Sequence, residues 1–118
     1  MPHAIATSGR HPEIDASLEA LSVPETTVVI DRGDVARAKP EPDLFMAAAA
    51  RLSIPAEECY VVGDAVWDLL AARRGRMFSV GLLTGGYGAD ELLAAGAYRV
   101  YRDAAELDAS LDELGVLP

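Results

Sequence analysis

The stretch that decides the fold is residues 61–68, Val-Val-Gly-Asp-Ala-Val-Trp-Asp. The apolar run at residues 59–62 is typical of a buried strand, and residues 66–74 are typical of a helix. A glycine and Asp64 lie between them, and Asp68 follows four residues later. The stretch therefore predicts a strand that ends on one carboxylate and a helix whose first turn carries a second.

The same pattern of an apolar strand followed by a helix recurs along the whole chain. We expect strands at residues 3–7, 26–30, 59–62, 77–81 and 97–101, and helices at residues 12–21, 43–52, 66–74, 89–95 and 104–114. Such alternation indicates an α/β fold, with a Rossmann-like parallel sheet and helices on both faces. The strands are nearly continuous apolar runs, as expected when both faces of a sheet are covered.

Composition limits the classes of function. A length of 118 residues predicts one domain. The formal charge of −9 disfavours binding to nucleic acid, because an acidic surface repels phosphate backbones. Cys59 is the only cysteine, so no internal disulfide forms, and a reducing cytoplasm fits. No run of 18 apolar residues and no charged-then-apolar leader occurs, so we expect neither a membrane span nor a signal peptide.

Ligands of such folds bind beyond the carboxyl ends of the strands, so the residues that follow each strand are candidates. Thr7, Ser8 and Gly9 follow the first strand, where a hydroxyl and exposed amides could hold an anion. The alternative is a plain turn with a capping serine. After the second strand, Pro40 biases Lys39 towards an extended backbone. A fixed ammonium suits a phosphoryl group or a carboxylate, and the alternative is a solvated lysine.

The third strand is followed by candidate metal ligands, whereas the fourth strand is followed by a loop without a recognisable binding motif. After the third strand, Asp64 and Asp68 can point into one crevice, and such hard oxygen ligands suit Mg²⁺. The alternative is that Asp64 caps the helix and Asp68 favours its dipole. After the fourth strand comes the glycine-rich loop at residues 82–87. It has the spacing of neither a dinucleotide nor a P-loop fingerprint, so we interpret it as a structural turn.

In this order, the motifs resemble those of the haloacid dehalogenase (HAD) superfamily, in its phosphoglycolate phosphatase-like and β-phosphoglucomutase-like branch. Thr7 is similar to the second motif of that family, and Lys39, in "KPEPDLF", to the third. Asp64 and Asp68 are similar to the acidic fourth motif. The likeness runs from about residue 3 to the end of the chain and covers the C-terminal part of the family's core domain.

The resemblance implies a role for each matching residue. Thr7 and Ser8 would bind phosphoryl oxygens, and Lys39 would neutralise the phosphate and the nucleophile, which makes Thr7 and Lys39 the catalytic candidates. Asp64 would ligate Mg²⁺, with Asp68 as a further ligand or a support. Groups that neutralise charge in this way are the usual apparatus of phosphoryl transfer.

One departure from the family pattern affects the expected activity. Family members begin with a strand that ends in Asp-x-Asp-x-Thr, whose first Asp is the nucleophile. No such motif occurs here, and the nearest imitation, Asp31 and Asp34, has a different spacing. We expect no cap domain within these residues either. We therefore expect residues 1–118 to form a single incomplete core domain of a phosphatase-type hydrolase, inactive alone. The alternative is a non-catalytic binding or assembly module of the same fold; the order of the motifs disfavours a receiver-like phospho-acceptor domain.

The absent strand is central in the family, between the strand that ends at Thr7 and the strand that ends at Val62. Open strand edges invite pairing, so either these two strands close on each other or another chain fills the gap. Strand exchange in a homodimer is one route, and a complementing chain is another. The partners expected from the sequence are thus a small phosphorylated molecule and a second polypeptide, with no nucleic acid and no membrane.

Overall fold

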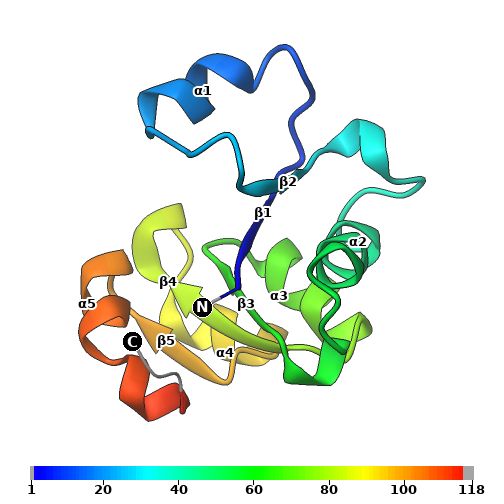
Figure 1. Cartoon of the computed structure of the whole chain (residues 1–118). Coiled ribbons are helices and arrows are strands. Elements are labelled where there is room, and N and C mark those ends of the chain that lie inside the picture. Colours follow the sequence, from blue (N-terminus) through cyan, green and yellow to red (C-terminus); the bar gives the residue numbers. More distant parts are fainter. Residues whose placement is uncertain (1, 116–118) are drawn as a thin grey trace.

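The computed structural model describes residues 2–115 and contains five parallel strands in two separate sheets (Figure 1). Strand β1 (Ala4–Ala6) pairs with β2 (Val28–Ile30). Strands β3 (Tyr60–Gly63), β4 (Phe78–Leu82) and β5 (Arg99–Tyr101) form the second sheet, in that order. Every pair is parallel, which confirms the α/β fold class.

The helices follow the strands as the alternation predicts. They are α1 (Asp15–Ala20), α2 (Asp43–Leu52), α3 (Val66–Arg74), α4 (Ala89–Ala95) and α5 (Ala104–Ala109), with 3-10 turns at Arg32–Asp34 (η1), Ala56–Glu58 (η2), Leu83–Gly85 (η3) and Leu111–Leu114 (η4). The bounds of α2, α3 and α4 are those expected. The first helix is shorter than expected and buries none of its residues, and Leu21 just beyond it is 73% exposed. The last helix breaks at Ser110 and continues as η4.

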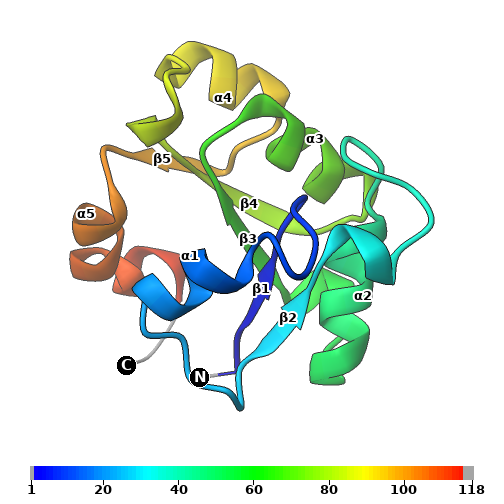
Figure 2. The same cartoon turned by 90° about the horizontal axis from the view of Figure 1, so that it is seen from above.

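Helices cover both faces of the three-stranded sheet (Figure 2). On one face, Leu69 of α3 and Leu92 of α4 are fully buried and pack with Val100 of β5. On the other face, Val80 of β4 packs against Leu107 of α5. This unit therefore has the layered core that a doubly covered parallel sheet requires.

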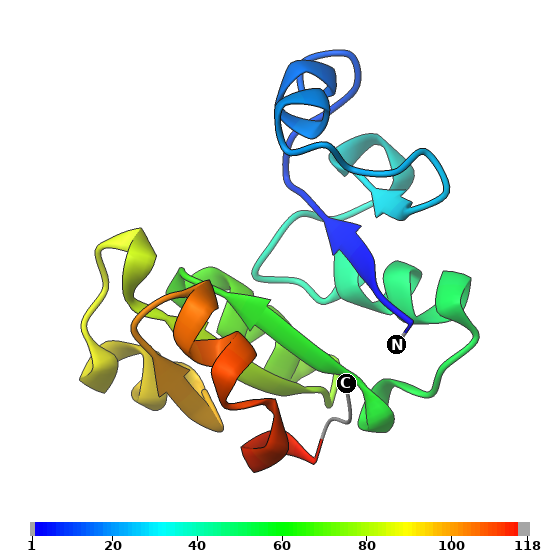
Figure 3. The same ribbon diagram turned by 60° about the vertical axis from the view of Figure 1, so that its left-hand side comes forward.

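Helix α2 connects the two sheets. Ala6 of β1 and Val61 of β3 pack in one cluster with Phe45 and Ala49 of α2. Between β1 and β3, however, no strand pairing occurs anywhere in the described chain, and the two-stranded sheet stands apart from the other (Figure 3). The flanking strands have thus not closed on each other. In residues 2–115, no helix combines the length and the hydropathy needed to cross a bilayer.

Candidate functional site

The centre of the site is an ion pair between the loop before α2 and the first turn of α3. The Lys39 Nζ donates to Asp68 Oδ1 over 2.6 Å, and the two side chains are only 16% and 14% exposed. Asp68 Oδ2 also accepts a hydrogen bond from the N–H of Ala65, at 3.3 Å. The ammonium lies 5.3 Å from the centre of the Phe45 ring, over its face. Lys39 is the only lysine of the chain, and it is held rather than freely solvated.

The loop that carries Lys39 is fastened on both sides of this residue. The Arg37 backbone N–H and guanidinium both donate to the Asp43 carboxylate, with Nη2 and Oδ1 2.9 Å apart. These bonds from Arg37 hold the pKa of Asp43 below its usual value. Glu41 accepts from Arg74 of α3 at 2.8 Å. The loop is thus fixed to its own helix and to α3, which limits the positions that the ammonium can reach.

Asp64 lies just beyond β3 and is positioned by the loop after β4. The Thr84 hydroxyl donates to Asp64 Oδ2 at 3.3 Å. A Cβ on Gly85 would come within 2.2 Å of the Asp64 carbonyl oxygen, so only glycine allows this approach. The loop that we interpreted as a plain structural turn therefore supports a site residue. Its place at the end of a strand was the available signal, because all such ends meet at one edge of the sheet.

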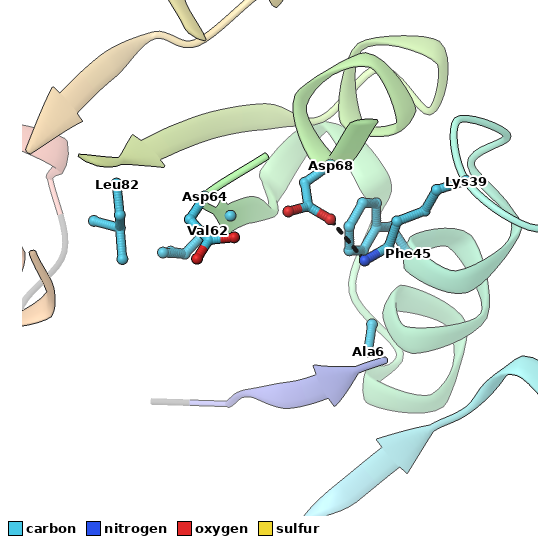
Figure 4. A pocket seen from close by; sticks show the side chains of 8 residues that line it. Ala6, Lys39, Phe45, Val62, Asp64, Asp68 and Leu82 are labelled. Carbon is cyan, nitrogen blue, oxygen red and sulfur yellow. Dashed lines mark hydrogen bonds and ion pairs between the residues drawn. The ribbon is translucent and has the colours of Figure 1, made fainter. Parts of the chain in front are cut away.

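The three charged residues meet in one cavity of about 260 Å³ (Figure 4). It opens between the carboxyl ends of β1 and β3 and is lined by Ala6, Lys39, Phe45, Val62, Gly63, Asp64, Asp68 and Leu82. A neighbouring cavity of about 480 Å³ shares Lys39 and Asp68 and adds Ser8, Pro40, Ala65 and Trp67. The structure thus brings Lys39, Asp64 and Asp68 together in one cavity and places Ser8 in the adjoining one, at the edge where strand-end chemistry was expected.

Thr7 does not line either of these cavities. Its backbone N–H donates to the Ile30 carbonyl, and its Oγ1 accepts from the N–H of Gly9 at 3.1 Å. The hydroxyl therefore stabilises the turn after β1 and keeps its own proton for another acceptor. Its phosphate-binding role, like that of Ser8, stays a prediction.

The donor set fits a magnesium ion only as a partial site. In residues 2–115, no three side chains of the metal-binding types His, Cys, Asp and Glu gather into one group. Mg²⁺ is commonly held by one or two carboxylates, with phosphate and water as the other ligands, so Asp64 and Asp68 are ligands of a suitable type. Both oxygens of Asp68 already accept protein hydrogen bonds. Asp64 is the carboxylate better placed to accept a cation.

Asp31 and Asp34, the nearest imitation of a nucleophile motif, have a structural task. Asp31 is 6% exposed and accepts hydrogen bonds from the N–H groups of His11 and Gly33, at 3.0 and 2.9 Å. The bond from His11 contributes most to a lowered pKa of Asp31. Asp34 in turn accepts from the Asp31 N–H at 2.9 Å. These two residues cap η1 and line neither cavity, so they supply no group to the site.

The sequence model of the haloacid dehalogenase-like hydrolases matches residues 1–76, more than half of the chain. The chain belongs to this family. The resemblance read from the motifs is thereby confirmed.

Solved structures of the family share the fold closely. A hydrolase from Pseudomonas syringae is 48% identical, with a TM-score of 0.90 over 94% of this chain and 52% of that one. A HAD family hydrolase from Deinococcus radiodurans R1, crystallised with bound phosphate and sodium, is 33% identical. Its TM-score is 0.84, over 97% of this chain and 53% of that one. The chain therefore spans about half of each of these proteins.

Among curated relatives, the phosphoglycolate phosphatase of Escherichia coli (strain K12) is 35% identical over 86 residues. The match covers 72% of this chain and 34% of that enzyme. This relative, together with a β-phosphoglucomutase, supports membership of the phosphoglycolate phosphatase-like and β-phosphoglucomutase-like branch. Over part of their length, this HAD-family chain is thus similar to known phosphatases.

Proposed function

We propose that the cavity beside the Lys39–Asp68 pair is the phosphate-binding part of a Mg²⁺-dependent phosphoester hydrolase, and that this chain alone turns over no substrate. The observation that carries the proposal is the 2.6 Å pair itself, 16% and 14% exposed, in the wall of a cavity that also holds Asp64. A desolvated and fixed ammonium binds a phosphoryl oxygen more strongly than a mobile, solvated one.

Each residue then has a separate task. Lys39 donates to a phosphoryl oxygen, and Asp68 holds the ammonium in position through the hydrogen bond described above. Ser8, in the adjoining cavity, and the Thr7 hydroxyl donate to further oxygens. Asp64 is the carboxylate assigned to the metal. A bound Mg²⁺ would supply positive charge against the phosphoryl group. The relative with bound phosphate supports a phosphorylated ligand for this fold.

A non-catalytic binding module is the second candidate, and one observation favours it. Both oxygens of Asp68 are engaged by protein donors, and Asp31 and Asp34 cap a turn outside the cavities. Of the two carboxylates that line these cavities in residues 2–115, Asp68 is thus engaged and Asp64 is assigned to the metal, so neither is left to act as a nucleophile. Binding of phosphate without hydrolysis is the result that this candidate predicts.

Trp67 allows a direct test of binding. It is the only tryptophan of the chain, is 52% exposed and lines the cavity that Lys39 shares. Titration with inorganic phosphate, with and without Mg²⁺, is expected to change its fluorescence. Lys39→Met is expected to weaken phosphate affinity about tenfold or more, because a charge-assisted hydrogen bond is lost. Arg51→Met, on the exposed side of α2, is the matched control and leaves affinity unchanged.

Turnover is tested with an aryl phosphate ester and Mg²⁺, using the purified chain and its Asp64→Asn variant. We expect phosphate binding without hydrolysis by the chain alone, and loss of the Mg²⁺ effect on binding in Asp64→Asn. Hydrolysis that Asp64→Asn abolishes would overturn the expected inactivity and make the chain an enzyme by itself. Absence of phosphate binding in the folded wild type would reject the proposed site.

We also propose that the protein is cytoplasmic, because a chain with a single cysteine fits a reducing compartment.

A further inference from the structure

Trp67 is a large aromatic side chain that the core leaves half exposed. It is the second residue of α3, directly before Asp68, and 52% of its surface is exposed. Its neighbours Val66, Leu69 and Leu70 on the same helix pack in the cluster between α3 and α4. Packing in the core therefore does not account for a tryptophan at this position.

Trp67 lines the larger of the two cavities at the carboxyl ends of the strands. The volume of about 480 Å³ falls within the range of roughly 300–1,000 Å³ that is usual for sites of small molecules. Three of the residues that line it are apolar, namely Pro40, Ala65 and Trp67. Apolar walls with a few polar groups are typical of sites for organic ligands, because the apolar surface binds the carbon skeleton. The larger cavity therefore suits the carbon part of a ligand.

Lys39 and Asp68 connect this cavity to the smaller one. Both residues line both cavities, and their side chains point toward one another (Figure 4). The ammonium is held 2.6 Å from Asp68 Oδ1, so a phosphoryl group bound to the ammonium lies where the two cavities meet. The rest of a phosphate ester then has the larger cavity to enter, where it meets Pro40 and Trp67. This step rests on the proposed function.

The larger cavity offers little to a second negative charge on the ligand. In residues 2–115, Lys39 is the only basic residue that lines either cavity. Three arginines of the neighbouring loops, Arg10, Arg32 and Arg37, line neither, and Arg37 already pairs with a carboxylate of α2. A carboxylate on the ligand would therefore meet the acidic side of the cavity without a cation to pair with, which disfavours its binding.

We propose that Trp67 is a specificity-determining residue, and that it selects phosphomonoesters whose carbon part contains a ring and carries no further charge. The indole packs against the flat apolar face of the ring while Lys39 holds the phosphoryl group. An aryl ring and a sugar ring both present such a face, and both gain from burial against an aromatic side chain. A small ligand with a second negative charge would leave the indole uncovered and its own charge unpaired.

Phosphonates test this selectivity without hydrolysis, because a phosphoester hydrolase does not cleave their P–C bond. The folded chain is titrated by calorimetry, in the presence of Mg²⁺, with methylphosphonate, phenylphosphonate and phosphonoacetate, and with inorganic phosphate as the reference. We expect phenylphosphonate to bind roughly tenfold more tightly than methylphosphonate, because the indole covers its ring. Phosphonoacetate, which carries a carboxylate, is expected to bind no more tightly than methylphosphonate.

Glucose 6-phosphate distinguishes the two kinds of ring. Tighter binding of this ester than of methylphosphonate would place sugar rings in the selected class. A gain confined to phenylphosphonate would restrict the class to aryl rings, since both probes meet the same indole.

Variants of Trp67 assign the selectivity to this residue. Trp67→Ala is expected to lower the ratio of phenylphosphonate to methylphosphonate affinity about tenfold, and Trp67→Phe to keep most of that ratio, because an aromatic face remains. Tyr98→Ala is the matched control. Tyr98 is 47% exposed and directly precedes β5, at the opposite end of the sheet from the cavities, so the ratio is expected to stay unchanged. Lys39→Met is expected to weaken all the probes alike.

A spectroscopic measurement supports the test if Trp67→Ala does not fold. The chain has one tryptophan, so its indole N–H gives a single NMR resonance. Phenylphosphonate is expected to shift this resonance through its ring current, and methylphosphonate to shift it far less.

The outcomes separate this inference from the proposed function. Equal affinities for phenylphosphonate and methylphosphonate, or tighter binding of phosphonoacetate than of phenylphosphonate, would overturn the selectivity and leave phosphate binding intact. Equal weakening of all probes by Trp67→Ala, with an indole resonance that phenylphosphonate does not move, would do the same. Failure of inorganic phosphate and of every probe to bind the folded chain would reject the proposed function and the inference with it.

Discussion

The two sheets are built from the same strand–helix pattern, yet they differ in how much they bury. In the β3–β5 unit (residues 56–115), Leu69, Val80 and Leu92 are fully buried between layers of helices. In the β1–β2 unit (residues 2–35), only Ile30 and Asp31 are buried, with 2% and 6% of their surface exposed. A two-stranded sheet with one small helix covers too little surface to be stable alone. The β1–β2 unit therefore depends on its packing against α2, whereas the β3–β5 unit has its own core.

The largest effect is expected from a pair of leucine truncations that compares burial in the two units. Leu92→Ala, between α3 and β5, is expected to lower the free energy of unfolding by about 2–5 kcal/mol, because a cavity forms in a closed core. Leu21→Ala, beside α1, is the matched control, and its side chain is 73% exposed. Its effect is expected to stay within about 0.5 kcal/mol. Urea unfolding followed by circular dichroism measures both. Similar losses of unfolding free energy in the two variants would mean that the β1–β2 unit has a stabilising core of its own.

The ion pair between Lys39 and Asp68 connects the chain that follows the β1–β2 unit to the β3–β5 unit. A double-mutant cycle with Lys39→Met and Asp68→Asn is expected to give a coupling energy of about 1–2 kcal/mol, since both groups are mostly buried. Each single variant leaves one polar group without its partner, so the double variant is expected to lose less than the sum of the single losses. Additive losses in urea unfolding would show that the pair is screened like a surface ion pair.

The loop after β4 tests how Asp64 is held in the more stable unit. Gly85→Ala is expected to lower the free energy of unfolding by about 1–3 kcal/mol, because its Cβ would overlap the backbone of Asp64. It is also expected to weaken the Mg²⁺ effect on phosphate binding. Gly88→Ala is the control, since a Cβ there meets only Glu91, at 3.6 Å. Unchanged Mg²⁺ dependence in Gly85→Ala would show that the loop does not position the carboxylate.

The parts of the fold that the sequence predicted are those set by local signals. Helix α2 begins after Pro42, and α4 ends just before Gly96, which adopts a left-handed backbone. The boundaries of these helices follow from residues inside or next to them. The sequence placed Lys39 and Asp68 each after a strand, where ligands of such folds bind, but it did not predict their pairing across 29 residues.

The parts that escaped prediction depend on distant partners. The sequence predicted a helix over residues 12–21, but α1 is shorter and buries none of its residues, because a helix buries a face only where another layer covers it, and Leu21 remains exposed. The role of Thr84 and Gly85 depends on how closely their loop approaches Asp64, which no spacing in the sequence encodes. The family's strand order predicted that β1 and β3 would either close on each other or be bridged by another chain, and the structure shows that they have not closed. Composition and periodicity say nothing about which strands are neighbours.

The smallest expected effect is a pH dependence confined to the β1–β2 unit. The Asp15 carboxylate, hydrogen-bonded to the His11 ring, raises the pKa of that histidine, and the charges of Asp31 and Asp34 add to the shift. Since the pKa of His11 is higher in the folded state, its stabilisation is fully present below about pH 6.5. It is lost as the pH rises through the folded pKa.

An NMR titration of His11 is expected to give a pKa above the ordinary value, and Asp15→Asn is expected to bring it down. Opening free energies from hydrogen exchange, corrected for intrinsic rates, should fall with rising pH at Thr7 but not at Val80, which lies in the other unit. His11→Gln should remove the difference at Thr7 and leave Val80 unaffected. A pH dependence shared equally by Thr7 and Val80 would mean that the two units open together. The units would then differ in burial but not in local stability.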